Sequence, residues 1–364
     1  MFKIVRVENA EHWKRFLNLP GSIYQGDPLW TPMPLESQKQ MFNPQSNPVL
    51  RHVRYECFIA LQDKKTVGRI IAATDDLLKD NRVGLFGGFE CINHPEVTRG
   101  LFEAASQSLF SRGKTIIQGP ATMNTSQQVG LLVEGFRLPP QMMMPYNPSY
   151  YKTLLEGNGF YPLLDLYSYQ WRQEEAVNQH KLFAVAKRAA RIPGIKLRPI
   201  NLKDTWGEGK KLAELHNQTM TQQWGYVPME QEEAAYYLAG LRGYTDPELL
   251  FFCEVDNIPV GVCLMTPDLG PKIRASRRYG FPRPFGEPKS LRVGVLGVAP
   301  DYRRRGVAAL LIEKAMKIGI RKGYQRAELS LIMESNTNMN QIITTAVGSR
   351  VNKRFRIYEK VIDV

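Results

Sequence analysis

The stretch that decides the fold is Ser290-Leu-Arg-Val-Gly-Val-Leu-Gly-Val-Ala-Pro-Asp-Tyr-Arg-Arg-Arg-Gly-Val-Ala-Ala-Leu-Leu-Ile-Glu-Lys-Ala-Met-Lys317. Its first part is an apolar, β-branched run that stops at Pro300. Its last part is apolar at the helical spacing of Val307, Leu311 and Ala315. The change from one period to the other predicts a strand, a turn and a helix in that order.

The turn of this stretch is basic and contains a glycine. It brings Arg303, Arg304, Arg305 and Gly306 to the start of the predicted helix. A helix N-terminus presents unpaired N–H groups and the positive end of its dipole, so such a turn suits a pyrophosphate. Gly306 is expected to let a ligand approach the backbone. The alternative is a solvated basic helix cap.

The spacing Arg303-x-x-Gly306-x-Ala308 after such a strand resembles motif A of the GNAT superfamily of acyl-CoA-dependent N-acyltransferases. By this resemblance the turn from Arg303 to Ala308, including Val307, holds the CoA diphosphate. The resemblance therefore implies acetyl-CoA or another acyl-CoA as co-substrate. No metal is implied.

The resemblance also implies a gap in the sheet. In the GNAT fold the fourth and fifth strands splay apart and the pantetheine lies between them. Residues 293–298 match the fourth strand and 326–333 the fifth. The backbone of Leu296, Gly297 and Val298 is then expected to bind the pantetheine and polarise the thioester carbonyl. Asn336 is expected to cap the next helix and to contact the cofactor.

The catalytic residues depart from the family pattern. Many GNAT enzymes have a tyrosine about four residues before the glycine that ends this helix, but counting back from Gly348 gives Thr344. Glu334 is the predicted base because it follows the fifth strand, and Glu328 is a second candidate. The alternative role of Glu334 is a helix-start carboxylate favoured by the dipole.

Acceptor contacts are expected after the first helix of the second half. Trp224, Tyr226 and Met229 follow that helix, where GNAT folds usually place them. Core packing is the alternative for these three side chains.

Size and charge limit the class of protein. The chain has 364 residues, which suggests two domains, and a formal charge of +13, which implies an acidic partner such as a CoA tail, anionic lipid or nucleic acid. Lys and Arg are dispersed and no recognition motif is present, so no nucleic-acid partner is expected.

No run approaches the roughly 18 apolar residues of a membrane span, and the N-terminus lacks a signal-peptide core. A cytoplasmic protein is expected, and the basic, aromatic insertion 272–285 suggests peripheral contact with an anionic inner membrane face; a solvated lid is the alternative.

The cysteines and histidines do not predict a metal centre. The four cysteines are far apart or inside apolar runs, and the five histidines are scattered. The cysteines are therefore expected to be buried thiols.

The order of elements repeats. Arg198 in the strand at 196–201 matches Arg6 in the first strand, and Gly261 matches Gly68. We therefore predict a diverged duplication: a degenerate GNAT-like domain at 1–171, a helical connector at 172–194 and a cofactor-binding GNAT domain at 195–364. Each is expected to be a mostly antiparallel mixed α/β sheet flanked by helices. Asn93 and Glu96 fall where the second copy has Arg303 and Gly306, so only the second copy is expected to bind the cofactor.

The whole chain resembles a bacterial tandem-GNAT family of similar length, in which some members are ceramide synthases. The segments that carry the likeness include Gly26-Asp-Pro-Leu-Trp-Thr-Pro, Gly130-Leu-Leu-Val-Glu-Gly-Phe, Met142-Met-Met-Pro-Tyr-Asn-Pro and Lys353-Arg-Phe-Arg-Ile-Tyr-Glu-Lys. This resemblance implies transfer of an acyl group, long-chain in ceramide synthesis, from CoA to an amine acceptor such as a lipid long-chain base. The alternatives are an acyl-CoA sensor without turnover and an N-acetyltransferase of a small metabolite or protein.

Overall fold

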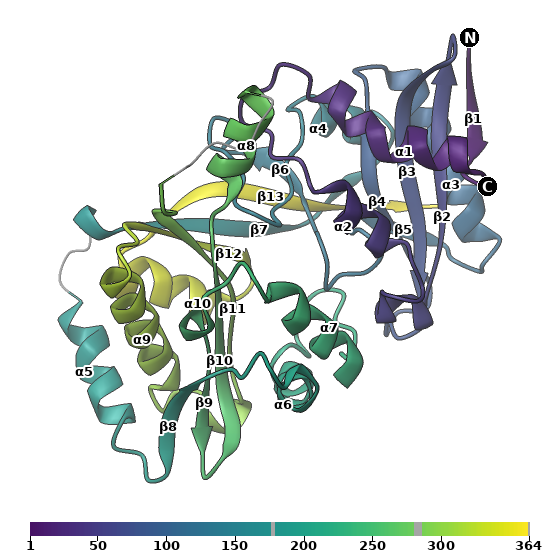
Figure 1. Cartoon of the computed structure of the whole chain (residues 1–364). Helices are drawn as coiled ribbons and strands as arrows, with labels where there is room; N and C mark the ends of the chain where they lie inside the picture. The colour runs from purple at the N-terminus through teal and green to yellow at the C-terminus, as the bar shows by residue number, and fades with distance from the viewer. Residues whose placement is uncertain (176–178, 280–285, 363–364) are drawn as a thin grey trace. The chain divides into compact units, whose positions relative to one another are not determined.

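The computed structural model describes residues 1–175, 179–279 and 286–362. The chain forms two compact units (Figure 1). Unit 1 comprises Met1–Leu166, Ile273–Phe281 and Lys353–Val364, and unit 2 comprises Tyr167–Lys272 and Pro282–Asn352. Both units are mixed α/β structures, as predicted. The predicted domain boundaries at residues 171 and 195 stay a prediction.

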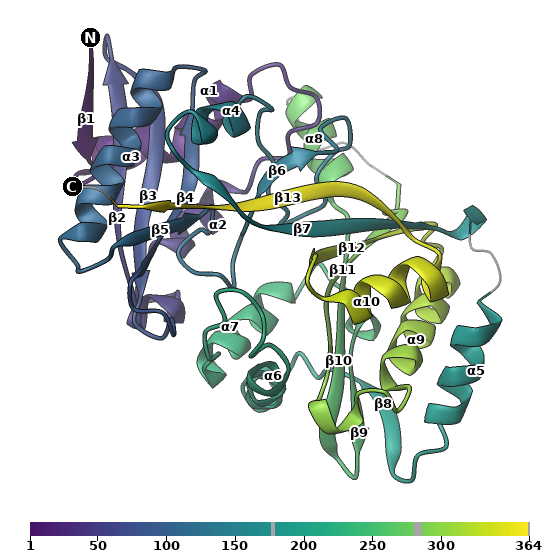
Figure 2. The same ribbon diagram turned by 180° about the vertical axis from the view of Figure 1, so that it is seen from behind.

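Unit 1 is built on the strand order β1-β2-β3-β4-β5-β13, and β6 also pairs with β13. Neighbours are antiparallel except for β4 and β5. One face of the sheet is covered by α3 and the other by α1, as Figures 1 and 2 show. The elements are β1 (Phe2–Arg6), α1 (Ala10–Ile23), α2 (Leu35–Met41), η1 (Pro48–Arg51), β2 (Val53–Gln62), β3 (Lys65–Asp75), β4 (Val83–Cys91), α3 (Pro95–Phe110), β5 (Ile116–Gly119), β6 (Leu131–Glu134), α4 (Tyr151–Glu156), α8 (Gly270–Tyr279) and β13 (Arg350–Val361).

Unit 2 is built on the order β7-β12-β11-β10-β9-β8. Strands β8 to β11 are antiparallel neighbours, and β11 and β12 are parallel. Helices α6 and α7 cover one face and α5 and α9 the other (Figure 1); we call these the α6 face and the α9 face. The elements are β7 (Tyr161–Arg172), η2 (Gln173–Glu175), α5 (His180–Ala189), β8 (Ile195–Pro199), α6 (Thr205–Thr219), α7 (Gln231–Leu241), η3 (Pro247–Leu249), β9 (Leu250–Val255), β10 (Ile258–Pro267), β11 (Ser290–Val298), η4 (Pro300–Tyr302), α9 (Val307–Arg321), β12 (Arg326–Met333), α10 (Thr337–Gln341) and the π-helix η5 (Ile342–Val347).

The two units share register as well as order. Arg6 lies opposite Phe58 in unit 1, and Arg198 lies opposite Phe252 in unit 2. In both units a glycine of the third strand lies under a leucine of the covering helix. A Cβ on Gly68 would stand 2.7 Å from Leu101, and one on Gly261 would stand 3.0 Å from Leu311. Both glycines let the helix lie close to the sheet, which supports the predicted duplication.

Each unit contains a strand segment from the other half of the sequence. In unit 1, β13 pairs antiparallel with β5, with Tyr358 opposite Gly119. In unit 2, residues 167–172 of β7 lie beside β12, and Gln173 N–H donates to Gln325 O over 2.9 Å. Residues 167–172 alternate aromatic and polar side chains, a pattern that predicts a strand but not which sheet the strand joins.

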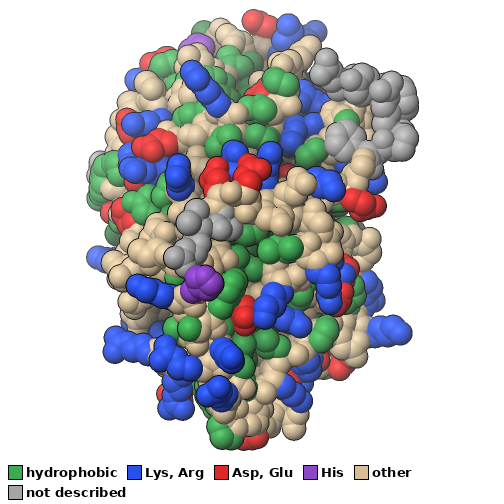
Figure 3. All heavy atoms as spheres, turned by 90° about the vertical axis from the view of Figure 1, so that its left-hand side faces the viewer, with side chains coloured by type: hydrophobic (Ala, Val, Ile, Leu, Met, Phe, Trp, Pro, Cys, Tyr) green, Lys and Arg blue, Asp and Glu red, His purple; other side chains and the backbone are tan. Residues whose placement is uncertain are grey.

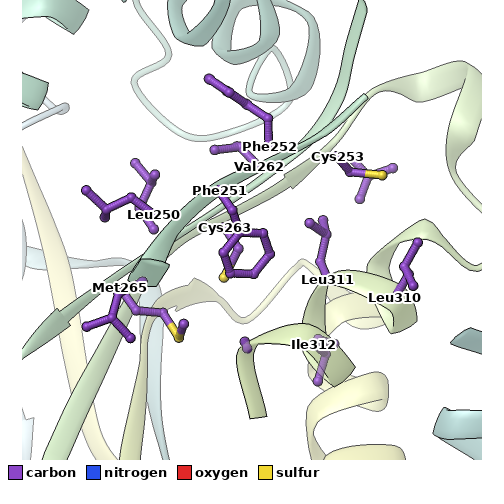
Figure 4. Close-up of a cluster of buried hydrophobic side chains, with 14 of the residues drawn as sticks. Leu250, Phe251, Phe252, Cys253, Val262, Cys263, Met265, Leu310, Leu311 and Ile312 are labelled. Carbon is purple, nitrogen blue, oxygen red and sulfur yellow. The ribbon is translucent and has the colours of Figure 1, made fainter. Parts of the chain in front are cut away.

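Part of the core of unit 2 lies between the sheet and α9. Figure 4 shows Leu311 and Ile312 of α9 facing Phe251 and Cys263 of the strands. Leu311, Cys253 and Cys263 are fully buried. Burying a side chain such as Leu311 contributes roughly 1.5–3 kcal/mol. This packing fixes the position of α9 and of the turn before it.

The cysteines are buried thiols, as predicted. All four are free and buried. Burial raises the pKa of Cys91 to about 11 and the pKa values of Cys253 and Cys263 to about 12, so these thiols stay protonated and unreactive at neutral pH.

Aspartate side chains hold the first turns of two helices. Helix α6 begins at Thr205, where Asp204 caps it by accepting a hydrogen bond from Gly207 N–H over 2.9 Å. The insertion after Pro267 contains α8. There Gly270 N–H donates to Asp268 Oδ1 over 2.9 Å at the start of the helix.

Candidate active site

A gap lies between the C-terminal halves of β11 and β12. The parallel ladder joins Ser290 to Arg326 and ends at Val293 and Leu329. Strand β11 continues to Val298 and remains paired with β10, while β12 continues to Met333. The segments 294–298 and 330–333 therefore form no ladder with each other. We call this opening the β11–β12 gap; it lies at the strands that the sequence predicted to splay.

The backbone of β11 turns donors toward the gap. Ala299 N–H donates to Val260 O over 2.9 Å, which makes this antiparallel pair a hydrogen-bonded one. Hydrogen-bonded and non-hydrogen-bonded pairs alternate along an antiparallel ladder. The N–H groups of Leu296 and Val298 therefore point away from β10 and into the gap, whereas that of Gly297 points toward β10. Two of the three predicted backbone positions thus present donors.

A bulge lies at the start of the gap. Leu264 is opposite Val295 and Met265 is opposite Val293, which leaves Gly294 without a partner on β10. Gly294 is exposed, and a Cβ there would meet only the Arg292 side chain, at 3.9 Å. A bulge bends its strand, and this one bends β11 where the ladder with β12 ends.

The basic turn leads into a helix that has no side-chain cap. Gly306 is the N-cap of α9 with φ +84°, so the first N–H groups of α9 have no acceptor from the cap side chain. Helix α5 fills the space on one side of this glycine. A Cβ on Gly306 would stand 3.0 Å from Val185 and 3.1 Å from Ala189. A ligand would therefore reach the turn from the side of its N–H groups.

The three arginines of the turn have different surroundings. Arg303 donates from Nε to Val298 O over 3.2 Å and from Nη2 to Thr219 O over 3.0 Å, so its guanidinium anchors the turn. The guanidinium of Arg305 lies 5.3 Å from the ring centroid of Tyr302. Arg304 is exposed and has a positive φ of 61°.

The segment after β12 is tied by asparagines. Asn336 caps α10 by accepting a hydrogen bond from Met339 N–H over 3.3 Å. Asn340 donates to the carbonyl oxygens of Met333 and Glu334 over 3.0 and 3.1 Å. Glu334 is exposed just beyond the gap. Its predicted role as base and the contact of Asn336 with the cofactor stay predictions.

The loop after α6 is held at one point of that helix. Asn217 accepts a hydrogen bond from Met229 N–H over 2.8 Å and donates to Met229 O over 3.0 Å, and it accepts from Tyr226 Oη over 3.3 Å. Trp224 N–H lies 3.3 Å from the sulfur of Met333, at the end of β12. The three predicted acceptor residues are half-buried, and Trp224 is directly beside the end of β12.

A polar cluster lies on the α6 face, and sequence reasoning named one member, Glu328, as a second candidate base but missed the residues around it. Arg292 lies opposite Glu328 and donates to Ser330 Oγ over 3.2 Å, and the buried Glu328 accepts from Ser168 Oγ over 2.6 Å. Burial lowers the pKa of Arg292, and burial raises the pKa of Tyr244 to about 12, with the charge of the nearby arginine opposing the rise. An arginine inside an apolar strand was the available signal.

In unit 1 the corresponding opening is filled by the chain itself. Gly87 of β4 is in contact with the segment after β5: a Cβ there would stand 2.3 Å from Ala121 O. Cys91, which lies opposite Gly68 as Val298 lies opposite Gly261, donates its N–H to Tyr151 Oη over 2.8 Å. A donor that faces the gap in unit 2 is thus satisfied internally in unit 1.

The turn of unit 1 is also shorter and capped. Only three residues separate Cys91 from Pro95 at the start of α3, and His94 caps that helix through Nδ1, 3.4 Å from Val97 N. This helix start has neither the arginines nor the glycine of the basic turn. Both differences agree with the prediction that only the second copy binds the cofactor.

The basic insertion is used within unit 1. Arg277 donates to the carbonyl oxygens of Asp27 and Tyr24 over 2.9 and 2.8 Å and stacks over Trp30, and Arg274 donates to Thr31 Oγ1 over 2.7 Å. These two cations are therefore not free for the predicted lipid contact; residues 280–285 lie outside the described part. Figure 3 shows Lys and Arg side chains over the side where α5 and α9 lie.

The described residues contain neither a membrane span nor a metal cluster. Among the helices of residues 1–175, 179–279 and 286–362, no apolar stretch has the length that crossing a bilayer requires. Within the same ranges, no group of three or more His, Cys, Asp or Glu side chains is arranged to hold a metal ion.

Comparison with known proteins identifies the family. A model of the Acetyltransferase (GNAT) family matches residues 210–342, from α6 to the start of η5. The chain is 30% identical to Protein YghO of Escherichia coli over 97% of its own length and 94% of that protein. It is 28% identical to the bacterial ceramide synthase of Caulobacter vibrioides, covering 99% of this chain and 97% of that one.

A solved structure supports the double fold. A tandem GNAT protein from the clavulanic acid biosynthesis pathway matches with a TM-score of 0.61 and 12% identity, covering 100% of this chain and 99% of the other. At this identity the likeness concerns the fold alone. Together with the family match and the full-length relative, it shows that the chain belongs to the GNAT acyltransferase family, with a tandem arrangement of two such folds.

Proposed function

We propose that the protein is an N-acyltransferase that moves an acyl group from a CoA thioester to an amine. The observation that carries the proposal is the β11–β12 gap, with the N–H groups of Leu296 and Val298 directed into it. A CoA thioester supplies the activated carbonyl. Donors aimed at that oxygen stabilise the negative charge that develops during attack.

In this proposal the diphosphate binds at the basic turn. The first N–H groups of α9, at Val307 and Ala308, and the charges of Arg304 and Arg305 suit an anion. Arg303 holds the turn against Val298 and Thr219. The same turn therefore connects the diphosphate site to the strand that receives the thioester.

The chemical step is direct transfer. The amine nitrogen attacks the thioester carbonyl, the C–S bond breaks and the amide forms. Glu334, the proposed base, takes the proton released by the amine, and the thiolate is protonated by water because Thr344 stands where many relatives have tyrosine. The hydroxyl of Thr344 donates to Asn340 O over 2.9 Å.

The acceptor that we propose is a lipid amine of the long-chain-base type. The relative named bacterial ceramide synthase matches this chain over 99% of its length, which supports this choice. The loop carrying Trp224, Tyr226 and Met229 is the proposed acceptor contact. Cytoplasmic location with peripheral contact at an anionic membrane belongs to the same proposal.

The experiment is a thiol-release assay with purified protein. Acyl-CoA thioesters from acetyl to palmitoyl are paired with long-chain bases, polyamines and amino acids, and the acylated product is identified by mass spectrometry. The proposal expects amine-dependent thiol release. Binding of acyl-CoA without release with any amine would instead identify a sensor, and preference for acetyl-CoA with a soluble amine would identify an N-acetyltransferase.

A further inference from the structure

A row of polar side chains crosses the sheet of unit 2 on its α6 face. Thr266 of β10 lies opposite Arg292 of β11, and Arg292 lies opposite Glu328 of β12. Ser168 of β7 donates to Glu328 over 2.6 Å and extends the row to a fourth strand. We call Thr266, Arg292, Glu328 and Ser168 the polar row. Arg292 is half-buried, whereas the other three side chains are buried.

Unit 1 has the same row in the same register, but with different residues. Ala73 lies opposite Leu85, and Leu85 lies opposite Gln118. Ala73 and Leu85 are fully buried. The unit whose opening is filled by the chain itself therefore has two apolar residues and a neutral amide in this row. The unit with the open gap has a hydroxyl group, a cation and a carboxylate at these positions.

The comparison shows that the fold does not require the charges of the polar row. Leu85 and Gln118 occupy the same register positions in unit 1 without an ion pair. Replacing a buried ion pair by uncharged residues of similar size is often neutral or even stabilising. Charges that the fold can do without point to a functional role for Arg292 and Glu328.

The side chain of Arg292 extends along β11 to the start of the β11–β12 gap. A Cβ on Gly294, the exposed residue of the bulge, would stand 3.9 Å from Arg292 Nε and 4.0 Å from its Cζ. Arg292 Nε donates over 3.2 Å to the hydroxyl of Ser330, the first residue of β12 beyond the parallel ladder. The guanidinium therefore lies where the two strands separate, beside an exposed position of the backbone.

This position is close to the proposed site of the thioester carbonyl. Gly294 precedes Leu296, whose N–H points into the gap, by two residues. Two residues of a strand span about 7 Å. An amine that attacks a carbonyl held at Leu296 would therefore be separated from the guanidinium of Arg292 by a few carbon atoms of its own molecule.

The chemistry of the polar row selects the group that binds there. A guanidinium offers N–H donors and no acceptor, so its ligand must present an oxygen or another acceptor atom. Glu328, directly opposite Arg292, balances its charge. A further carboxylate or phosphate would be placed beside Glu328 without a counterion, which is costly. The phenols of Tyr237 and Tyr244, which lie close enough to influence the pKa of Arg292, add hydroxyl groups and no charge. A neutral oxygen is therefore favoured.

We infer that Arg292 binds a neutral oxygen, a hydroxyl or a carbonyl, that the acceptor carries close to its amine. Arg292 thereby selects amino alcohols and amino ketones over plain amines. The inference rests on the proposed function, because it requires an amine that attacks a thioester in the gap. It adds a specificity-determining residue on the α6 face, at a position where unit 1 has Leu85.

The test compares two acceptors that differ by one hydroxyl group, 2-aminododecan-1-ol and 2-aminododecane. Their kcat/KM values are measured with the acyl-CoA that gives the fastest thiol release. The wild type should prefer the amino alcohol by about tenfold or more, and Arg292→Leu should reduce this preference to below about threefold. Arg326→Leu is the matched control. It removes an exposed arginine from the same strand pair and should keep the wild-type preference.

A double variant covers the case in which Arg292→Leu does not fold. Arg292→Leu alone leaves Glu328 buried without the cation opposite it. Arg292→Leu combined with Glu328→Gln reproduces the Leu85 and Gln118 pair of unit 1 and should be more stable in urea than either single variant. The double variant should also lose the preference for the amino alcohol.

The outcomes separate this inference from the proposed function. Thiol release at equal kcat/KM with both acceptors in the wild type would overturn the inference and leave N-acyl transfer standing. A folded double variant that keeps the wild-type preference would make the polar row purely structural. Preference for 2-aminododecanoic acid over the amino alcohol would overturn the choice of a neutral oxygen. Absence of thiol release with every amine would instead overturn both proposals.

Discussion

Arg303 joins the basic turn to the end of α6, because its Nη2 donates to Thr219 O over 3.0 Å. Its Nε donates to Val298 O, the last residue of β11. One side chain therefore connects β11, the C-terminal end of α6 and the basic turn. This geometry makes Arg303 a positioning residue rather than a free phosphate ligand.

The first prediction distinguishes two contributions of Arg303: the hydrogen bonds that position the turn and the positive charge of its guanidinium. Arg303→Lys keeps the charge but loses the planar fork that reaches both carbonyls. With each of the two hydrogen bonds contributing about 1 kcal/mol, Arg303→Lys and Arg303→Ala should both weaken CoA binding by up to about thirtyfold. Calorimetry at two salt concentrations is the measurement. Arg304→Ala is the control, and its smaller loss should decrease with salt. Recovery of full affinity by lysine would contradict the positioning role.

The second prediction concerns Gly306. An alanine at position 306 would have an unfavourable positive φ and its Cβ would also contact α5. An alanine at position 323 would have the same kind of backbone strain, with φ +81°, but no atom lies within 4 Å of its Cβ. Gly323→Ala should lower the free energy of unfolding by about 1 kcal/mol, and Gly306→Ala by about 1 kcal/mol more. Urea unfolding measures both. Equal losses would mean that α5 moves away freely.

The third prediction compares a glycine at the β11–β12 gap of unit 2 with a glycine at the corresponding, filled opening of unit 1. Gly87→Ala places a methyl group against Ala121 O, whereas the exposed Gly294 has only the Arg292 side chain nearby, at 3.9 Å. Gly87→Ala should cost more than about 2 kcal/mol of unfolding free energy. Gly294→Ala should change it by less than about 0.5 kcal/mol. Thermal and urea unfolding measure the unfolding free energies of the two variants. If Gly87→Ala is as stable as the wild type, the opening in unit 1 is only loosely filled.

The fourth prediction is a pH dependence from the ion pair of Arg198 and Glu254. Burial of Glu254 raises its pKa, but hydrogen bonds and charge from Arg198, which lies 2.7 Å away, outweigh burial and leave the pKa below 4.5. A carboxylate with a lowered folded-state pKa stabilises the protein above its unfolded pKa and loses this contribution as the pH falls through the folded value. Unfolding free energy should therefore decline below about pH 4.5.

The matched variant tests this assignment. Arg198→Ala leaves both Glu254 and Glu208 buried without that partner and should cost about 3 kcal/mol at pH 7. The difference in unfolding free energy between the wild type and Arg198→Ala, measured with urea from pH 7 to pH 3, should shrink as Glu254 becomes protonated. A difference that stays constant over this range would exclude the electrostatic explanation.

The fifth prediction distinguishes the two candidate carboxylates. Glu334 is exposed, so Glu334→Gln should leave the free energy of unfolding within about 0.5 kcal/mol and lower kcat about a hundredfold if it is the base. Glu328 is buried and accepts a hydrogen bond from Ser168, so Glu328→Gln should mainly reduce stability. Turnover and unfolding are measured on both. Unchanged kcat in Glu334→Gln would remove it as the base.

Local patterns made part of this structure predictable. The strand, turn and helix around Pro300 followed from apolar spacing, and the β11–β12 gap followed from the family resemblance that this spacing supports. The contact of Gly306 with α5 and the anchoring of Arg303 at Thr219 were not predictable, because they join segments far apart in the sequence. Glu328 was named as a candidate base, but its place opposite Arg292 was missed because each residue alone only interrupts an otherwise apolar strand.

The placement of β13 has a consequence for how the protein is made. Strand β5 of unit 1 has β4 as one neighbour but acquires its second neighbour only from residues 358–361, far later in the sequence. On the ribosome, the edge of this sheet beside β5 therefore stays open until those residues have been synthesised. Nascent chains halted before β13 should be aggregation-prone and should depend on chaperones, because β13 closes the edge of a sheet that was synthesised long before it.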